Sequence, residues 1–182
     1  NDMAGFSEAF AQASRESEAA FGDGAIYLER FLPRVRHIEV QVLGDGRGNS
    51  RQRDERDCSI QRRHQKLVEE SPSPVVDAAL RARLLDVSGC LTRGLAYEGA
   101  GTVEFIFDET SGEFFFIEMN TRIQVEHPVT EMRIGLDLVE AQFKIAQGHP
   151  LPSLDENTMP GGHAIEFRIN AEDWLRGFVP SP

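Results

Sequence analysis

The chain has 182 residues, of which 40% are hydrophobic, and its formal net charge is −11. This length suits one medium domain or one domain with part of a second, and the apolar fraction suffices for a core, which excludes general disorder. The negative charge excludes nucleic acid and anionic membranes as the main partner, because both select basic surfaces. The sequence holds no apolar run near 18 residues and begins with a polar, acidic stretch, so it predicts neither a transmembrane helix nor a signal peptide.

The two cysteines, Cys58 and Cys90, are too few for a disulfide framework, so two reduced thiols in a cytoplasmic protein are expected. Residue 1 is Asn rather than Met, and residues 178–182 end just after a new strand pattern has begun. Both observations predict a chain cut from a longer protein.

The first third of the chain predicts one helix and two strands. Residues 7–21 predict a helix with Ser7 as its N-cap and Gly22 as its stop. Residues 25–30 predict a short strand. Residues 37–43 alternate strictly between apolar and polar side chains, which predicts a second strand. Its polar face is expected either to face water or to line a site.

Residues 44–49 (GDGRGN) predict a hairpin turn. They contain a G-x-G-x-G pattern, but the Lys-Ser/Thr of a P-loop is missing and no helix pattern follows, so the turn is favoured over a phosphate loop. Apolar residues at helical spacing predict a helix between Val75 and Leu95. Residues 102–108 and 113–119 predict a hairpin of two strands.

The last third predicts a helix over 136–147, a linker around 151–162 and a strand over 164–169. Strands and helices mix without a regular βαβ rhythm. The pattern therefore favours an α+β fold over a doubly wound sheet.

The hairpin at 102–119 carries two carboxylates. With a three-residue loop at 110–112, Glu104 lies opposite Glu118, and Asn120 shares their face. Such oxygen ligands suit Mg²⁺ or Mn²⁺, although an exposed acidic face is as plausible from the hairpin alone. The opposite face of the hairpin is apolar and is predicted to pack against a hydrophobic core. Its residues are Val103, Phe105, Phe107, Phe115 and Ile117.

A basic cluster occupies residues 55–70, ERDCSIQRRHQKLVEE, in an otherwise acidic protein. Such clustering can create a local anion site. From charge alone, a solvated stretch that pairs with its own acidic residues is favoured. The basic residues and histidine are Arg56, Arg62, Arg63, His64 and Lys66.

Two long motifs resemble the signature stretches of biotin carboxylases. They are ERDCSIQRRHQKLVEE and FIEMNTRIQVEHPVTEM, and the second also resembles a signature shared with carbamoyl-phosphate synthetase. YLERFLPRVRHIEVQVLGDGRGN, GAGTVEFIF, GLDLVEAQ and RINAED match in order, so the resemblance covers nearly the whole chain. It implies an ATP-grasp fold, in which two α+β lobes clamp ATP, and ATP-dependent carboxylation of biotin with bicarbonate through carboxyphosphate.

The resemblance implies a partial domain organisation. Residues 1–150 would form an ATP-grasp domain without its N-terminal part, 151–160 a linker, and 161–182 the start of the biotin carboxylase C-terminal domain. The family's glycine-rich loop and two ATP-binding lysines would precede residue 1, and another active-site arginine would follow Pro182. Residues 1–182 alone are therefore expected to be inactive and to bind ATP weakly.

The resemblance also implies roles for individual residues. The catalytic residues are Glu126 as the general base, Arg122 and Lys66. The nucleotide-binding residues are Glu29, Arg30 and Leu32 at the adenine hinge, with His37, Gln61, His64 and Ile106. The bicarbonate and biotin residues are Arg122, Gln124, Val125 and Glu126. The ligands of two Mg²⁺ or Mn²⁺ ions are Glu104, Glu118 and Asn120.

The implied partners are a biotin carboxyl carrier protein or domain, a carboxyltransferase and further copies of the parent chain, with neither nucleic acid nor membrane. A eukaryotic parent would be mitochondrial. The final acceptor is not encoded here, because the carboxyltransferase selects it.

Two departures and two rival hypotheses accompany the resemblance. Residues 50–54 are polar where a mostly apolar strand is expected, which predicts a frameshifted stretch or an edge strand, and the loop between Glu104 and Glu118 is about two residues longer than expected. Carbamoyl-phosphate synthetase shares the FIEMN motif but lacks the QRRHQK and EHPVTE combination. A non-catalytic fragment or pseudoenzyme kept for assembly is the other rival.

Overall fold

The computed structural model describes residues 5–153 and 162–181. Its chain divides into two compact units, Asn1–Pro33 and Arg34–Pro182. The first unit contains helix α1, Phe6–Phe21, which ends at Gly22 in a left-handed conformation. The predicted helix is confirmed, but its N-cap is Gly5 rather than Ser7. The strand predicted over 25–30 is wrong, because these residues are irregular and mostly exposed.

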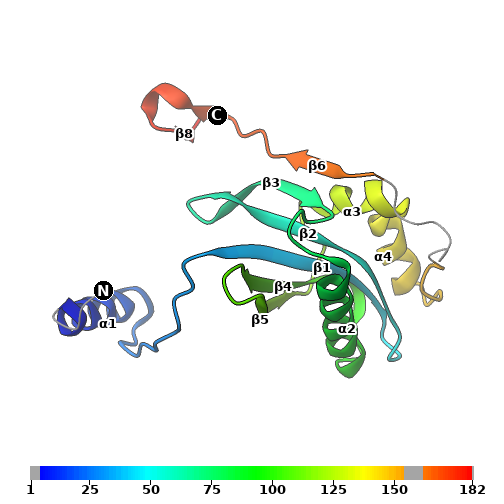
Figure 1. The fold of residues 1–182 in the computed structure, drawn as a ribbon, viewed down its shortest axis with the longest axis horizontal. Coiled ribbons are helices and arrows are strands. Elements are labelled where there is room, and N and C mark those ends of the chain that lie inside the picture. The colour runs from blue at the N-terminus through cyan, green and yellow to red at the C-terminus, as the bar shows by residue number, and fades with distance from the viewer. Residues whose placement is uncertain (1–4, 154–161, 182) are drawn as a thin grey trace. The chain divides into compact units, whose positions relative to one another are not determined.

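The second unit is built on an antiparallel sheet with the strand order β5-β4-β1-β2-β3-β6 (Figure 1). The strands are β1 Val35–Asp45, β2 Ser50–Arg62, β3 Gln65–Ser71, β4 Glu98–Asp108, β5 Glu113–Asn120 and β6 Ala164–Phe167. A small second sheet pairs β7 Glu172–Asp173 with β8 Val179–Pro180, around the 3-10 helix η2 Trp174–Arg176. The mixture confirms an α+β fold.

The turn between β1 and β2 is a tight hairpin loop. Asp45 Oδ1 accepts the backbone N–H groups of Arg47 and Asn49 at 2.8 and 3.0 Å. Gly46 and Gly48 have φ values of 72° and 85° there, in the region that favours glycine. The turn interpretation is confirmed, since a carboxylate of the chain itself takes the donors that a phosphate would need.

The polar stretch at 50–54 forms the first part of β2. Ser50 pairs with Gly44 and Gln52 with Val42 of β1, whereas the pairs with β3 begin at Asp57. Asp54 is buried and accepts a hydrogen bond from Arg133 at 2.9 Å. The strand therefore forms in spite of its composition, and its first part is paired along one side, as the edge-strand hypothesis expects.

Helix α2, Ala78–Gly94, covers one face of the sheet. It begins at the N-cap Asp77, whose carboxylate accepts the N–H of Leu80, so it starts three residues later than predicted. The core beneath it is apolar. It contains Ile38, Val40, Val42, Val76, Leu80, Leu84, Val103, Phe105 and Phe107.

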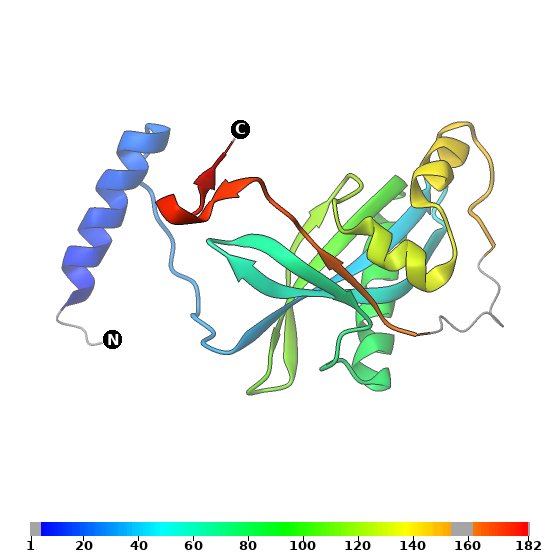
Figure 2. The same cartoon turned by 90° about the horizontal axis from the view of Figure 1, so that it is seen from above.

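Helices α3, His127–Ile134, and α4, Leu138–Ala146, lie over the other face at one end of the sheet (Figure 2). The predicted second helix is confirmed as α4, whereas α3 was not predicted. A smaller core here joins Leu43 and Ala100 to Leu138, Ala141 and Ile145. Both faces of β1 are therefore covered, and its buried Glu39 and Gln41, 0% and 4% exposed, point to a site rather than a wet surface.

The β4–β5 hairpin has the predicted pairing but not the predicted loop. Glu104 faces Glu118, yet Asp108 pairs with Glu113, so the loop is four residues long and one irregularity follows Glu104. Phe114 packs against the core, whereas Phe116 is 55% exposed. Phe114 and Phe116 pack against Phe105, with ring centroids 5.4 and 6.4 Å apart.

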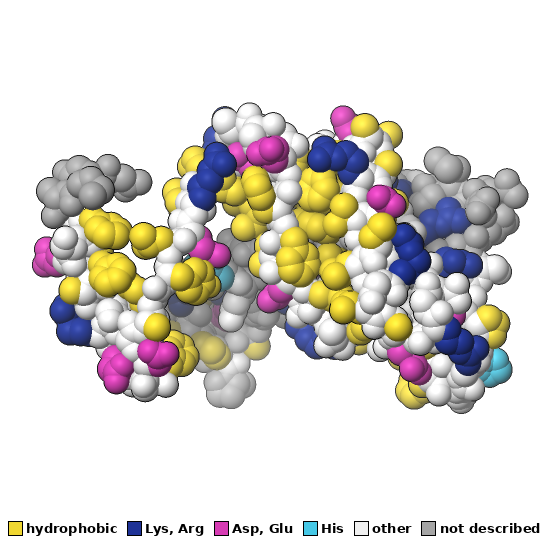
Figure 3. Space-filling view, turned by 90° about the horizontal axis from the view of Figure 1, so that it is seen from below, with side chains coloured by type: hydrophobic (Ala, Val, Ile, Leu, Met, Phe, Trp, Pro, Cys, Tyr) yellow, Lys and Arg dark blue, Asp and Glu magenta, His cyan; other side chains and the backbone are white. Residues whose placement is uncertain are grey.

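The prediction that two further residues of this hairpin lie in the core is wrong. Phe115 and Ile117 are 39% and 42% exposed rather than buried. Figure 3 shows hydrophobic side chains gathered on part of the surface seen from below. Among the described residues, no helix is long and apolar enough to cross a membrane.

The predicted linker lies largely outside the described residues. The strand after it, β6, pairs antiparallel with β3, from Ser71↔Ala164 to Val68↔Phe167. It thereby extends the sheet that carries the site. The assignment of 161–182 to a separate C-terminal domain stays a prediction.

We predict that the two thiols differ strongly in reactivity. Cys58 is fully buried, and burial together with the Glu39 charge raises its pKa well above the usual value, whereas Cys90 is exposed. Because the thiolate is the nucleophile, alkylation of Cys90 at pH 8 should be faster than that of Cys58 by about 100-fold or more. Peptide mapping after timed labelling measures this, and labelling in denaturant provides the control. Equal labelling in the folded protein would contradict the burial of Cys58.

Candidate active site

A pocket of about 480 Å³ opens between the β2–β3 and β4–β5 hairpins, the segment after β5 and the segment after β6. Ten of the residues predicted for the site line it. They are His37, His64, Lys66, Glu104, Glu118, Asn120, Arg122, Gln124, Val125 and Glu126. Residues far apart in the sequence thus meet in one cavity, and the role of each stays a prediction.

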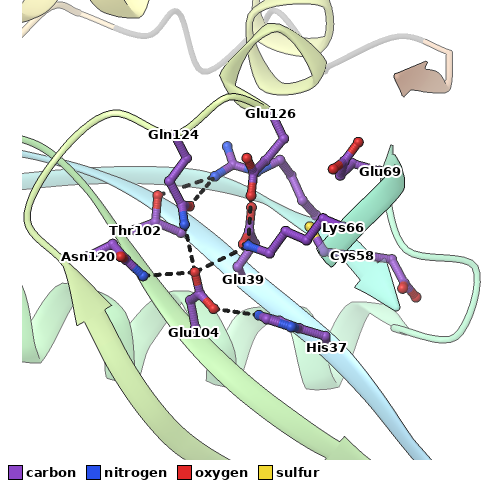
Figure 4. A network of polar contacts seen from close by, with 12 residues as sticks. His37, Glu39, Cys58, Lys66, Glu69, Thr102, Glu104, Asn120, Gln124 and Glu126 are labelled. Atoms are coloured by element: carbon purple, nitrogen blue, oxygen red, sulfur yellow. Dashed lines mark hydrogen bonds and ion pairs between the residues drawn. The ribbon is translucent and has the colours of Figure 1, made fainter. Parts of the chain in front are cut away.

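Lys66 lies at the centre of a carboxylate cluster (Figure 4). Its Nζ donates to Glu39 Oε2 at 2.6 Å, to Glu126 Oε1 at 2.7 Å and to Glu104 Oε1 at 3.2 Å. Burial opposes the charged form, but the charge of Glu39 and the hydrogen bonds outweigh it and raise the pKa of Lys66. The ammonium group therefore stays charged and compensates carboxylates from three different segments.

Glu126 is held between two cations. Only 1% of it is exposed, and Arg168 Nη2 donates to its Oε2 at 2.8 Å while Lys66 holds Oε1. It lies in a turn at the N-cap of α3, which confirms the prediction of a position outside strands and helices. Arg122 lines the same pocket, and its described hydrogen bond goes to the carbonyl of Ile123 at 3.2 Å.

Arg168 is a site residue that the sequence reasoning missed. The further active-site arginine was expected beyond Pro182, yet Arg168 reaches Glu126 and also donates from Nε to Glu69 Oε1 at 2.7 Å. The backbone N–H of Arg168 bonds to the carbonyl of Leu67, which continues the β3–β6 pairing. The matching RINAED motif was the available signal, because it begins at this residue.

The two carboxylates of the β4–β5 hairpin converge on one amide. Asn120 Nδ2 donates to Glu104 Oε1 at 2.9 Å and to Glu118 Oε1 at 3.0 Å. The predicted common face is confirmed. Glu104 is buried and Glu118 exposed, and both line the pocket. Two carboxylates and an amide at the wall of an open pocket fit Mg²⁺ or Mn²⁺, which take few protein ligands and keep room for phosphate oxygens.

Glu104 remains ionised over the whole neutral range. Burial raises its pKa, but the hydrogen bonds from His37 and Gln124 and the charge of Lys66 outweigh this and lower the pKa to about 2. His37 Nε2 lies 2.5 Å from Glu104 Oε2. A charged carboxylate at this position is what cation binding requires.

Gln61 and Ile106 stand behind the pocket lining rather than in it. Gln61 Nε2 approaches His37 Nδ1 at 3.0 Å, which favours the tautomer with the proton on Nε2, directed at Glu104. Ile106 is the β4 partner of His37. These contacts assign Gln61 a role in orienting His37.

The three residues predicted for the adenine hinge belong to the unit Asn1–Pro33. Glu29 and Arg30 are exposed and Leu32 is partly exposed. Their contribution to a nucleotide site stays a prediction.

Comparison with known proteins gives the family. The model of the carbamoyl-phosphate synthase L chain, ATP binding domain, matches residues 1–154. Methylcrotonoyl-CoA carboxylase subunit alpha, mitochondrial, from Arabidopsis thaliana is 51% identical over 176 residues, which cover 97% of this chain and 24% of that protein. Biotin carboxylase from Nostoc sp. is 51% identical over 177 residues, or 97% of this chain and 39% of the relative.

The structural comparison agrees. The biotin carboxylase domain dimer of 2-oxoglutarate carboxylase from Hydrogenobacter thermophilus, in complex with MgADP, ADP and bicarbonate, superposes with a TM-score of 0.84 at 48% identity. The match covers 96% of this chain and 38% of that one. The chain belongs to the biotin carboxylase domains of this ATP-grasp family. It spans between 24% and 39% of the length of these three relatives.

Proposed function

We propose that the protein containing this biotin carboxylase domain carboxylates biotin on a carrier protein, using ATP and bicarbonate through carboxyphosphate. The observation that carries the proposal is Glu126, a buried carboxylate held by Lys66 and Arg168 in the pocket that also contains Glu104 and Glu118. Similarity to biotin carboxylases and to a domain bound to MgADP and bicarbonate supports it.

The cations of the pocket suit an anionic substrate. Bicarbonate that takes over the contacts of Lys66 and Arg168 would leave Glu126 free to accept its proton, and deprotonation makes bicarbonate a better nucleophile. An oxygen of bicarbonate then bonds to the γ-phosphorus while the bond from phosphorus to the bridging oxygen of ADP breaks. Mg²⁺ or Mn²⁺, when bound by Glu104, Glu118 and Asn120, supplies charge neutralisation for the phosphates.

The second half of the reaction needs a base and an anion stabiliser. Carboxyphosphate breaks down to CO₂ and phosphate, and the phosphate removes the N–H proton of biotin before the nitrogen attacks CO₂. Arg122, exposed at the wall of the pocket, would stabilise the enolate-like biotin anion. This assigns the attack of bicarbonate on ATP and the attack of biotin on CO₂ to one cavity.

The partners follow from the reaction. A biotin carboxyl carrier and a carboxyltransferase would deliver biotin and use the product, and a dimer of the parent chain is proposed because one relative forms a biotin carboxylase domain dimer. The relatives' names include mitochondrial and chloroplastic forms, so the compartment depends on the source. The acceptor of the carboxyl group would be selected by the carboxyltransferase and not by this chain.

The test is phosphate release from ATP by the protein as it occurs. With Mg²⁺, release should require bicarbonate and should become faster when biotin is added. A pseudoenzyme kept for assembly would bind nucleotide without biotin-dependent release, and that result would overturn the proposal. Release that depends on bicarbonate but does not respond to biotin would favour a ligase of the carbamoyl-phosphate synthetase type.

A further inference from the structure

Among the residues that the structure describes, Arg56 is the largest side chain that is fully buried, and it lies outside the lining of the pocket. Its three guanidinium nitrogens donate five hydrogen bonds, which matches the number of N–H groups that arginine carries. The acceptors are Glu39 Oε1 at 2.5 Å, Gln41 Oε1 at 2.9 Å, Thr130 Oγ1 at 2.7 Å, Thr102 Oγ1 at 3.2 Å and Gln124 Oε1 at 3.5 Å. A single group thus connects β1, β4, α3 and the segment after β5.

The burial excludes the two sequence-based interpretations of this residue. Arg56 is 0% exposed, so it neither belongs to a solvated charged stretch nor offers its charge to an anion from solution. Its partners are all side chains of the folded chain. Its effect on the pocket must therefore pass through other residues.

One path from Arg56 to the pocket runs through the amide of Gln124. Nη2 of Arg56 faces Gln124 Oε1, and this fixes the other end of the amide as the donor group. Gln124 Nε2 then donates to Glu104 Oε1 at 2.7 Å. The guanidinium thereby determines that an N–H group, and not a carbonyl oxygen, meets the Glu104 carboxylate.

The other path runs through Glu39, whose two oxygens are divided. Arg56 Nε holds Oε1 and Lys66 Nζ holds Oε2 at 2.6 Å. Glu39 is fully buried, so without Arg56 its charge would rely on Lys66 alone. Lys66 would then be drawn toward Glu39 and away from Glu126.

We propose that Arg56 is a positioning residue for the bicarbonate end of the pocket. Its hydrogen bonds orient Gln124 and Glu39, and these two residues in turn position Glu104 and Lys66. This inference rests on the proposed function for its kinetic consequence, but the orientation of Gln124 can be observed independently of any activity.

The test is Arg56→Lys in the protein as it occurs. Lysine keeps the charge but offers three donors on a flexible stem without the planar fork, so it cannot serve all five acceptors. The KM for bicarbonate should rise by about tenfold or more, while the KM for ATP should change by less than about threefold. A crystal structure of the variant should show that the Gln124 amide no longer donates to Glu104.

Thr130→Val is the matched control. It removes another buried acceptor of the same guanidinium, but one that leads to α3 and not to the pocket. Thermal stability should fall while the KM for bicarbonate stays within about twofold of the starting value. If both variants lose stability, and the KM values for bicarbonate and for ATP change to the same extent in Arg56→Lys, then Arg56 is only structural and the proposal fails.

A variant that does not fold and a protein without the proposed activity are distinguished by further measurements. If Arg56→Lys does not fold, Gln124→Ala decides, because it removes the amide without burying a charge; an unchanged KM for bicarbonate would then refute the path through Gln124. If the unaltered protein shows no bicarbonate-dependent phosphate release, the proposed function fails, and the crystal structure of Arg56→Lys still decides whether Arg56 orients Gln124.

Discussion

Glu126→Gln is expected to abolish bicarbonate-dependent ATP hydrolysis while the affinity for ATP changes by less than about threefold, since a positioned general base contributes about 10²–10⁴-fold in rate. Glutamine has nearly the same size, but its amide cannot accept the proton of bicarbonate. It also gives up the charge that Lys66 and Arg168 contact at 2.7 and 2.8 Å. Steady-state phosphate release with calorimetric ATP binding measures both quantities.

Glu140→Gln is the matched control, because Glu140 is exposed on α4 and pairs with Lys144. Its activity should equal that of the unaltered protein. If Glu126→Gln kept its turnover within about tenfold, equal to about 1.4 kcal/mol of transition-state stabilisation, Glu126 would not be the base.

Lys66→Met is expected to cost both activity and stability. The substitution leaves the carboxylates of Glu39, Glu104 and Glu126 without their shared cation. Removing one partner of a buried ion pair typically costs about 3–5 kcal/mol in the free energy of unfolding. Activity should fall by about 100-fold or more, because the cation that would hold bicarbonate is gone.

The loss of stability should depend on pH. Glu39 and Glu104 have pKa values below the usual range in the folded chain, so their contribution is present above the pKa of an unfolded glutamate, near 4.5, and is lost as pH falls. The deficit of Lys66→Met should therefore be largest at neutral pH and smaller at pH 4. Urea unfolding without divalent cations measures it. Lys144→Met, an exposed lysine, should change stability by less than about 0.5 kcal/mol. An equal deficit at both pH values would contradict the ion cluster.

Much of the fold could be predicted where one periodicity was clear. The alternation in β1 and the apolar spacing of α2 were sufficient, because the apolar face of each packs into the same core. Helix α3 was missed because it has only eight residues and few apolar ones. The strand over 25–30 was predicted from residue types alone, and no described neighbouring strand pairs with it.

The site was predictable only as far as motifs reach. The pairing of Glu104 with Glu118 followed from the hairpin, although the actual loop has four residues and an irregularity follows Glu104. The exposure of Phe115 and Ile117 was not predicted. Arg168 and Arg56 both lie within the matching motifs, but the sequence did not show which side chains they contact. The pairing of β3 with β6 brings Arg168 into the pocket, and the buried Arg56 contacts residues behind the pocket lining. Tertiary contacts of this kind leave no periodicity in the sequence.

The transfer of oxygen from labelled bicarbonate tests the central claim most directly. The protein as it occurs would be supplied with ATP, Mg²⁺, biotin and bicarbonate carrying ¹⁸O, and the released phosphate would be analysed by mass spectrometry. If bicarbonate attacks the γ-phosphorus and carboxyphosphate then breaks down, each phosphate keeps one bicarbonate oxygen. Phosphate that carries no label, formed at the same rate, would show that water attacks ATP and would contradict the proposed reaction.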